Sequence, residues 1–115
     1  RPVPPPVVAT FLVDTGASNS LVDEALMRTL ELTPTSSTAY HSSSTNGVAQ
    51  RCDVYDVQLV LGGIARPTTL RFDPLAIMAT VFINHPFAGL LGRDILNRVQ
   101  LGWNGPTKIL RIEYQ

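Results

Sequence analysis

Asp14, Thr15 and Gly16 form the segment of this sequence whose residue types could do chemistry. They follow the apolar run Phe11–Val13, which predicts a buried strand because aromatic and β-branched residues suit a covered, pleated surface. A carboxylate at the end of such a strand is costly unless it is hydrogen-bonded or neutralised. Asp14 is therefore either a functional residue or part of a local turn, since Asp and Gly both favour turns.

The other residues with catalytic or metal-binding chemistry form no second set. His41 and His85 lie far apart in the sequence without the helical spacing of a metal site, so no metal ligand set is visible. Cys52 is the single cysteine, and we interpret it as a small buried residue rather than a nucleophile. Nine basic and nine acidic side chains without a basic cluster argue against nucleic acid as a partner.

The 115 residues predict one β-rich domain over residues 7–115, preceded by a Pro-rich arm over residues 1–6. We expect a strand from Asp53 to Leu61, because apolar residues alternate there, and short helices over residues 22–30 and 93–99. The many short strands and turns indicate an all-β, barrel-like domain. In this interpretation the larger aromatic side chains anchor the core, namely Phe87 and Trp103.

A Ser/Thr-rich segment separates the first helix from the strand that begins at Asp53. It contains Asn46-Gly47, a strong hairpin signal, and predicts an exposed hairpin with its tip at residues 44–47. A solvent loop without function is the alternative interpretation. No apolar stretch reaches the ~20 residues of a membrane span, and the first residues do not form a signal peptide, so we expect a cytoplasmic location.

Two segments, FLVDTGAS and GLLGRDIL, flank this Ser/Thr-rich hairpin. Their order resembles the retropepsin family of aspartic proteases over nearly the whole chain, from Val7 to Tyr114, and the motifs are most similar to cellular, prokaryotic-type members. The resemblance implies an all-β acid-protease fold: a closed barrel with a flap hairpin, one or two short helices, and one lobe per chain. It also implies an aspartic endopeptidase without metal or other cofactors.

Peptide hydrolysis by two carboxylates explains why a single Asp-Thr-Gly is half a site. One carboxylate must be ionised to take a proton from water, and the other must be protonated to polarise the carbonyl group. The sequence has only one Asp-Thr-Gly, and two-fold symmetry can supply the second carboxylate. We therefore predict an obligate homodimer that pairs Asp14 with its symmetry mate and takes a peptide or protein as its substrate.

The resemblance assigns three groups of site residues. The catalytic loop would contain Asp14, Thr15, whose hydroxyl locks the two loops across the dimer, and Gly16, which lets backbone approach the carboxylate and substrate. Substrate-binding roles would fall to Ala17, Ser18, Asn46, Gly47 and Val48. A structural buttress behind the loop would come from Leu91, Gly92, Arg93 and Asp94.

Two further segments gain expected roles. The hairpin at residues 40–52 would be a flap that closes over the peptide and excludes water. The closing strand from Lys108 to Tyr114 would form an intermolecular sheet between the subunits.

The sequence also departs from the retroviral pattern. The expected flap tip has only Gly47, and Ser18 stands where retroviral members often carry the acid that pairs with their arginine. The partner of Arg93 is therefore open, with Asp94 and Glu24 as candidates. An alternative function is a catalytically weak or inactive retropepsin-like dimerisation or peptide-binding module, and a third is a structural β-domain.

Overall fold

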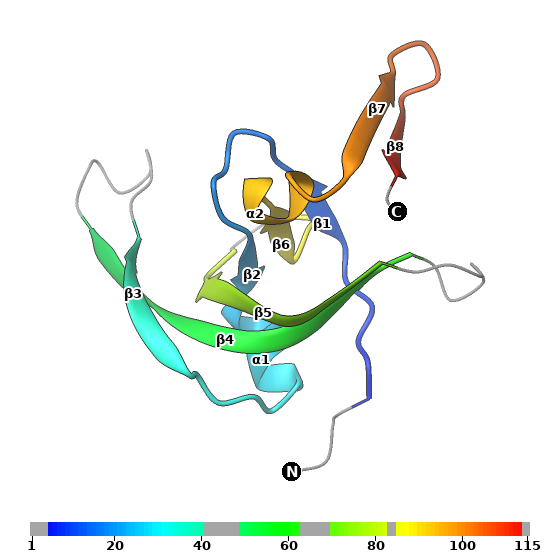
Figure 1. The fold of residues 1–115 in the computed structure, drawn as a ribbon. Coiled ribbons are helices and arrows are strands. Elements are labelled where there is room, and N and C mark those ends of the chain that lie inside the picture. The colour runs from blue at the N-terminus through cyan, green and yellow to red at the C-terminus, as the bar shows by residue number, and fades with distance from the viewer. Residues whose placement is uncertain (1–4, 41–48, 63–69, 83–84, 114–115) are drawn as a thin grey trace.

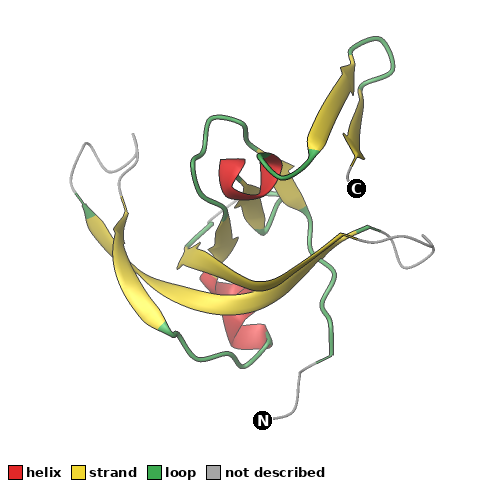
Figure 2. Ribbon diagram, viewed as in Figure 1, coloured by secondary structure: helices red, strands yellow, loops and turns green. Residues whose placement is uncertain are grey.

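The computed structural model describes residues 5–40, 49–62, 70–82 and 85–113. They form a six-stranded sheet in the order β1-β6-β2-β5-β4-β3 and a separate hairpin of β7 and β8 (Figure 1). Strands dominate and both helices are short, which confirms the all-β fold class (Figure 2). The elements are β1 (Phe11–Val13), β2 (Leu21–Asp23), α1 (Glu24–Thr29), β3 (Ser36–Tyr40), β4 (Gln50–Leu61), β5 (Leu70–Thr80), β6 (Gly89–Leu91), α2 (Arg93–Leu96), β7 (Gln100–Asn104) and β8 (Ile109–Glu113).

The closed barrel expected from the resemblance is wrong for the part of the chain that the structure describes. The six-stranded sheet is open, with β1 and β3 at its two edges. The long strands β4 and β5 curve across the molecule as an antiparallel pair, while β7 and β8 pair with each other instead of joining the sheet (Figure 1). The edges are therefore never brought together.

The pairing of β1 with β6 positions the Asp-Thr-Gly segment. The two strands run parallel, with Leu12 opposite Leu90 and Val13 opposite Leu91. Parallel neighbours end at the same edge of a sheet, so Asp14, which follows β1, lies beside Gly92, which follows β6. Residues far apart in the sequence are thus brought together.

The first helix and the first strand differ from their predictions. The helix expected over residues 22–30 begins only at Glu24, because Leu21–Asp23 pairs with β5 and β6 as strand β2, and the Asp23 carboxylate caps the helix by accepting from the Ala25 amide. Strand β1 is half-buried rather than buried, with Leu12 45 % exposed. Its edge position explains this exposure, since only β6 pairs with it.

The second helix is also shorter than expected. It ends at Leu96 rather than Val99 and buries Ile95 and Leu96 in the core. The core packs these two residues of α2 and Met27 of α1 against the inner face of the sheet. Its remaining buried members are Val22, Tyr55, Phe72, Leu75, Ile77, Ala79 and Leu91.

The β7–β8 hairpin extends away from the rest of the chain (Figure 1). Trp103 lies on it and is 65 % exposed, so its expected role as a core anchor is wrong. Phe87 is half-buried and stacks on His85, outside the core cluster. Among the described residues, the hairpin pairs only with itself and adds no residue to the core, which explains its exposure.

Candidate active site

The Asp14 loop combines the two roles that the sequence left open, a turn and an accessible carboxylate. The Asp14 amide donates to the Leu91 carbonyl at 2.9 Å, and the Ala17 amide donates to the Asp14 carbonyl at 3.2 Å. The Gly16 amide donates to Asp14 Oδ1 at 2.9 Å, so one carboxylate oxygen closes the turn. Within the described residues, Oδ2 accepts no hydrogen bond and is free for another group.

Gly16 lies close to the carboxylate that its amide contacts. A Cβ atom there would lie 3.2 Å from Asp14 Oδ1, so a larger residue would require that side-chain oxygen to shift by a few tenths of an ångström.

Arg93 ties the start of α2 to the Asp14 loop. Its Nη1 atom donates to the Thr15 carbonyl and its amide to the Ala17 carbonyl, both at 2.8 Å. Neither Asp94 nor Glu24, the two partners considered from sequence, pairs with it, as the ion pairs of the described chain join Arg28 to Glu24 and Arg111 to Glu113. A carbonyl therefore takes the place of the expected carboxylate partner.

A buried hydrogen-bond network lies directly behind the loop. Ser20 is 1 % exposed, and both its amide and its hydroxyl donate to the Asp94 carboxylate, at 3.0 and 2.7 Å. The Ser20 hydroxyl accepts in turn from the Gly92 amide at 2.9 Å, and Asp94 Oδ1 also accepts from the Ile95 amide. Every polar group of this network has a partner, so it fixes the two loops relative to one another.

Sequence reasoning missed Ser20. A serine before an apolar pair is indistinguishable from a surface serine until the chain places it against Asp94, 74 positions away. The only signal was its place just before the apolar pair Leu21-Val22.

Gly92 permits the close contact between the two loops. A Cβ atom at this residue would lie 2.6 Å from the backbone carbonyl carbon and oxygen of Asn19 and 3.0 Å from the Ala17 carbonyl oxygen. These are backbone atoms that cannot move aside cheaply. The glycine therefore allows α2 to begin in contact with the Asp14 loop.

The structure brings together some predicted site residues and not others. Hydrogen bonds join the Asp14 loop to the segment behind it: the Asp14 amide donates to Leu91, and Arg93 donates to the carbonyls of Thr15 and Ala17. Gly16 bonds within the loop to Asp14, and Gly92 and Asp94 bond to Ser20. Ser18 is exposed, and its only hydrogen bond in the described chain is a long one from Asn19 Nδ2. Asn46, Gly47 and Val48 lie outside the described residues. The flanking strands β3 and β4 do form an antiparallel pair up to Tyr40 and Gln50.

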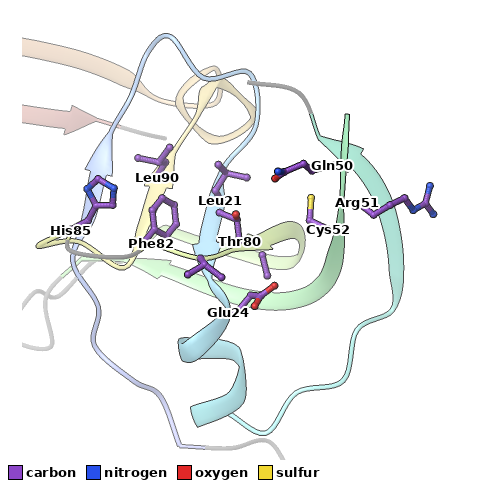
Figure 3. Close-up of a pocket in the computed structure, with 11 residues that line it drawn as sticks. Leu21, Glu24, Gln50, Arg51, Cys52, Thr80, Phe82, His85 and Leu90 are labelled. Atoms are coloured by element: carbon purple, nitrogen blue, oxygen red, sulfur yellow. The ribbon is translucent and has the colours of Figure 1, made fainter. Parts of the chain in front are cut away.

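A cavity of about 470 Å³ opens over strands β2 and β6 (Figure 3). Leu21 and Leu90 line it and lie directly opposite one another in β2 and β6. Leu90 is also opposite Leu12 in β1, so the three side chains share one face of the sheet. Phe11 and Val13 pack against the core from the opposite face, and Asp14 follows directly after the strand ends.

Cys52 also lines the cavity, at the start of β4. It is buried, as expected, and its thiol lies 3.9 Å from the Thr38 carbonyl. Burial raises the pKa of the thiol, and the charges of Asp53 and Glu24 raise it further. The thiol is therefore held in its protonated form at neutral pH.

The described part of the chain contains neither a cluster of metal-ligating side chains nor a membrane-spanning helix. No group of three or more His, Cys, Asp or Glu side chains there is arranged to hold a metal ion. No helix among these residues is long and apolar enough to cross a membrane.

The sheet, the Asp-Thr-Gly turn and the supporting network together define an aspartic protease-like domain. An aspartyl protease family model matches residues 6–95, and the chain belongs to this family, which is part of the retropepsin-like clan. Searches of the curated proteins and of the solved structures found no match. The matched segment includes β1 to β6 and ends within α2, before the β7–β8 hairpin.

Proposed function

We propose that this protein is an aspartic endopeptidase whose active site forms in a homodimer, with Asp14 and its symmetry mate activating the attacking water. The observation that carries the proposal is the Asp14 carboxylate, held by Gly16 at Oδ1 and left without a partner at Oδ2 within the described chain. A neighbouring carboxylate would drive the two pKa values apart, so that one group acts as base and the other as acid.

The second carboxylate must come from a second copy of the chain. The described chain contains one Asp-Thr-Gly, and the other aspartate near the loop, Asp94, is occupied by Ser20 and the Ile95 amide. Asp94 is thus unsuited to be the second catalytic acid. A two-fold axis beside Asp14 would supply an identical carboxylate in the required position.

The β7–β8 hairpin offers a surface for this dimer. Leu101 is opposite Ile112, and Trp103 is opposite Leu110, so these four side chains share one face, which we call the apolar hairpin face. Three of them are more than a third exposed. An isolated two-stranded hairpin is marginally stable in water, and a second copy covering this face would stabilise it.

The remaining residues of the site take the roles that the family resemblance gives them. Thr15 would join the two catalytic loops across the axis, and Ala17 and Ser18 would line the substrate floor. The hairpin at residues 40–52, including Asn46, Gly47 and Val48, would close over the peptide as a flap. The network from Gly92, Arg93 and Asp94 would hold the catalytic loop in place, a role that its hydrogen bonds support.

The decisive experiment compares wild type with Asp14→Asn on a diverse peptide library at mildly acidic pH, where a coupled pair of carboxylates works best. We expect cleavage to fall about 100-fold to 10 000-fold in the variant, because it lacks the general base. Sedimentation equilibrium must show that both proteins are dimers. A verified wild-type dimer that cleaves nothing would contradict the proposal and favour the peptide-binding module instead.

The dimer surface is tested with Trp103→Ser in sedimentation experiments over a range of concentrations. We expect the dissociation constant to rise at least about thirtyfold, as for a buried aromatic residue at the centre of an interface. Ile109→Ser is the matched control, since Ile109 is exposed on the opposite, polar face of the hairpin. Equal effects of the two changes would exclude the apolar hairpin face as the dimer contact.

A further inference from the structure

The cavity over strands β2 and β6 has the chemistry of a pocket for a side chain with an apolar stem. Its apolar lining includes Leu21, Val81 and Leu90. Phe82 and His85 add two aromatic rings at one end, in edge contact with one another at a centroid distance of 6.0 Å (Figure 3). The face of a phenylalanine ring attracts cations as well as apolar groups, so Phe82 suits this end to an aliphatic chain with a positive head.

Glu24 is the only carboxylate among the described residues that line the cavity. It is the first residue of α1, and its carboxylate lies on the side of the cavity where Thr80 and Cys52 are found (Figure 3). The partner nearest to it is Arg28, at 3.8 Å, in an ion pair whose side chains are 72 % and 38 % exposed. Such a surface pair is weak and leaves the carboxylate available to a ligand.

The one basic side chain of the described lining with a permanent charge does not oppose Glu24. Arg51 belongs to the wall, but its guanidinium extends outward from the cavity (Figure 3). Its Nη2 atom donates to Ser37 Oγ at 2.7 Å, which holds it against β3. The charge presented inward by these two residues is therefore negative.

The cavity lies on the sheet face to which Leu12, two residues before the proposed catalytic residue Asp14, belongs. Leu21 and Leu90 are the strand neighbours that share this face with Leu12. A peptide lying over this face would place one side chain in the cavity while its backbone passes Asp14.

We infer that the cavity is a specificity pocket for a basic side chain, lysine or arginine, with Glu24 as the residue that selects it. The aliphatic stem would contact Leu21 and Leu90, and the positive head would lie between the aromatic end and the Glu24 carboxylate. This inference rests on the proposed endopeptidase function. It adds a class of substrate, peptides with a basic residue at one position near the cleaved bond.

The test measures cleavage of peptide sets in which each position in turn carries Lys, norleucine or Glu, with norleucine matching the lysine stem without its charge. Wild type should prefer Lys over norleucine at one position by about threefold to tenfold. Glu24→Gln should remove this preference, so that Lys and norleucine peptides are cleaved at similar rates. Glu24→Lys should reverse it in favour of Glu.

Two matched variants separate a local effect from a general change of charge. Asp56→Asn removes the same charge from an exposed site on β4 that does not line the cavity, and it should leave the preference unchanged. Arg28→Gln frees Glu24 from its ion pair and should maintain or strengthen the preference. A Lys-to-norleucine ratio that is the same in wild type and Glu24→Gln overturns the inference while the protease function stands.

A binding measurement decides the inference even if wild type cleaves no peptide, an outcome that would overturn the proposed function alone. Nα-acetyl-lysine amide and Nα-acetyl-norleucine amide are titrated into the protein, and amide NMR shifts are followed at Leu21 and Cys52. The lysine probe should shift these signals at lower concentration, and Glu24→Gln should abolish the difference. Equal responses to the two probes would show that the cavity does not select charge.

Discussion

The Asp14 end of the sheet buries polar groups that are hydrogen-bonded, whereas the β7–β8 hairpin exposes apolar side chains. At the Asp14 end, the buried hydroxyl of Ser20 and the carboxylate of Asp94 satisfy one another and the backbone around them. On the hairpin, Trp103 and its neighbours present an apolar face to solvent. The network of the first region is satisfied within one chain, whereas the second leaves an apolar face exposed, which the proposed dimer would cover.

This difference shows how the proposed function divides between one chain and two. The position of the Asp14 carboxylate is set by contacts inside a single chain, through the Leu91 carbonyl and the Gly16 amide. The pairing of two such carboxylates depends on association. Substitutions at the Asp14 end should therefore change folding stability, and matched substitutions on the hairpin should leave it nearly unchanged.

The largest contrast is expected between two isoleucines. Ile95 of α2 is 0 % exposed and Ile109 of β8 is 60 % exposed. Ile95→Ala leaves a cavity in the core and should lower the free energy of unfolding by about 2–5 kcal/mol. Ile109→Ala should change it by less than about 0.5 kcal/mol. Urea unfolding at one protein concentration measures both, and similar losses would contradict the distinction between the two regions.

Two glycines give the next contrast. Gly92→Ala would force a Cβ atom to within 2.6 Å of the Asn19 backbone and should destabilise the fold by about 1–3 kcal/mol. At Gly102 of β7 the nearest atom to an added Cβ, the Arg111 Cβ, lies at an ordinary 3.8 Å. Gly102→Ala should therefore be neutral or slightly stabilising. Thermal unfolding of the two variants checks this, and a stable Gly92→Ala protein would show that the loops can separate at little cost.

Two carboxylates give a third contrast, in which the expected change in folding stability is equal to or smaller than that for the two glycines. Asp94→Ala leaves the buried Ser20 amide and hydroxyl without their acceptor and should cost about 1–3 kcal/mol. The matched change on the hairpin is Glu113→Ala, which removes an exposed ion pair with Arg111 at 3.4 Å. It should change stability by less than about 0.5 kcal/mol. Chemical denaturation gives both values. An Asp94→Ala protein as stable as wild type would show that the network does not hold the loop in position.

The smallest effect concerns alkaline pH and the thiol of Cys52. Its pKa is raised above the ordinary 9.0, first by burial and then by Asp53 and Glu24. A thiol with a higher pKa in the folded than in the unfolded chain contributes stability that is fully present below pH 9.0 and declines as the pH rises through its folded pKa. Wild type should therefore lose more stability than Cys52→Ala between about pH 8 and pH 10.5. Denaturation midpoints along this range measure it, and parallel losses in the two proteins would show that Cys52 is not the titrating group.

Much of the fold and of the site could be predicted from local sequence. The alternation from Asp53 to Leu61 predicted most of β4, and the Asp-Thr-Gly and Gly-Arg-Asp segments predicted the family that the comparison found. The start of α1 could not be predicted in this way. Leu21 shares an apolar helical face with Ala25 and Leu26. Residues Leu21–Asp23 nevertheless form a strand because β5 and β6 pair with them on either side.

What the sequence determined by itself is the candidate chemistry: a single Asp-Thr-Gly after an apolar strand, which is half of the proposed two-carboxylate site. The tertiary structure decided the contacts that hold it. Arg93 could be expected to need a partner, but the choice of the Thr15 carbonyl depends on the parallel pairing of β1 and β6. The burial of Ser20 and the position of Glu24 in the lining of the cavity also depend on tertiary packing. Burial and hydrogen bonding between distant segments are properties of the packed chain and leave no local pattern in the residues.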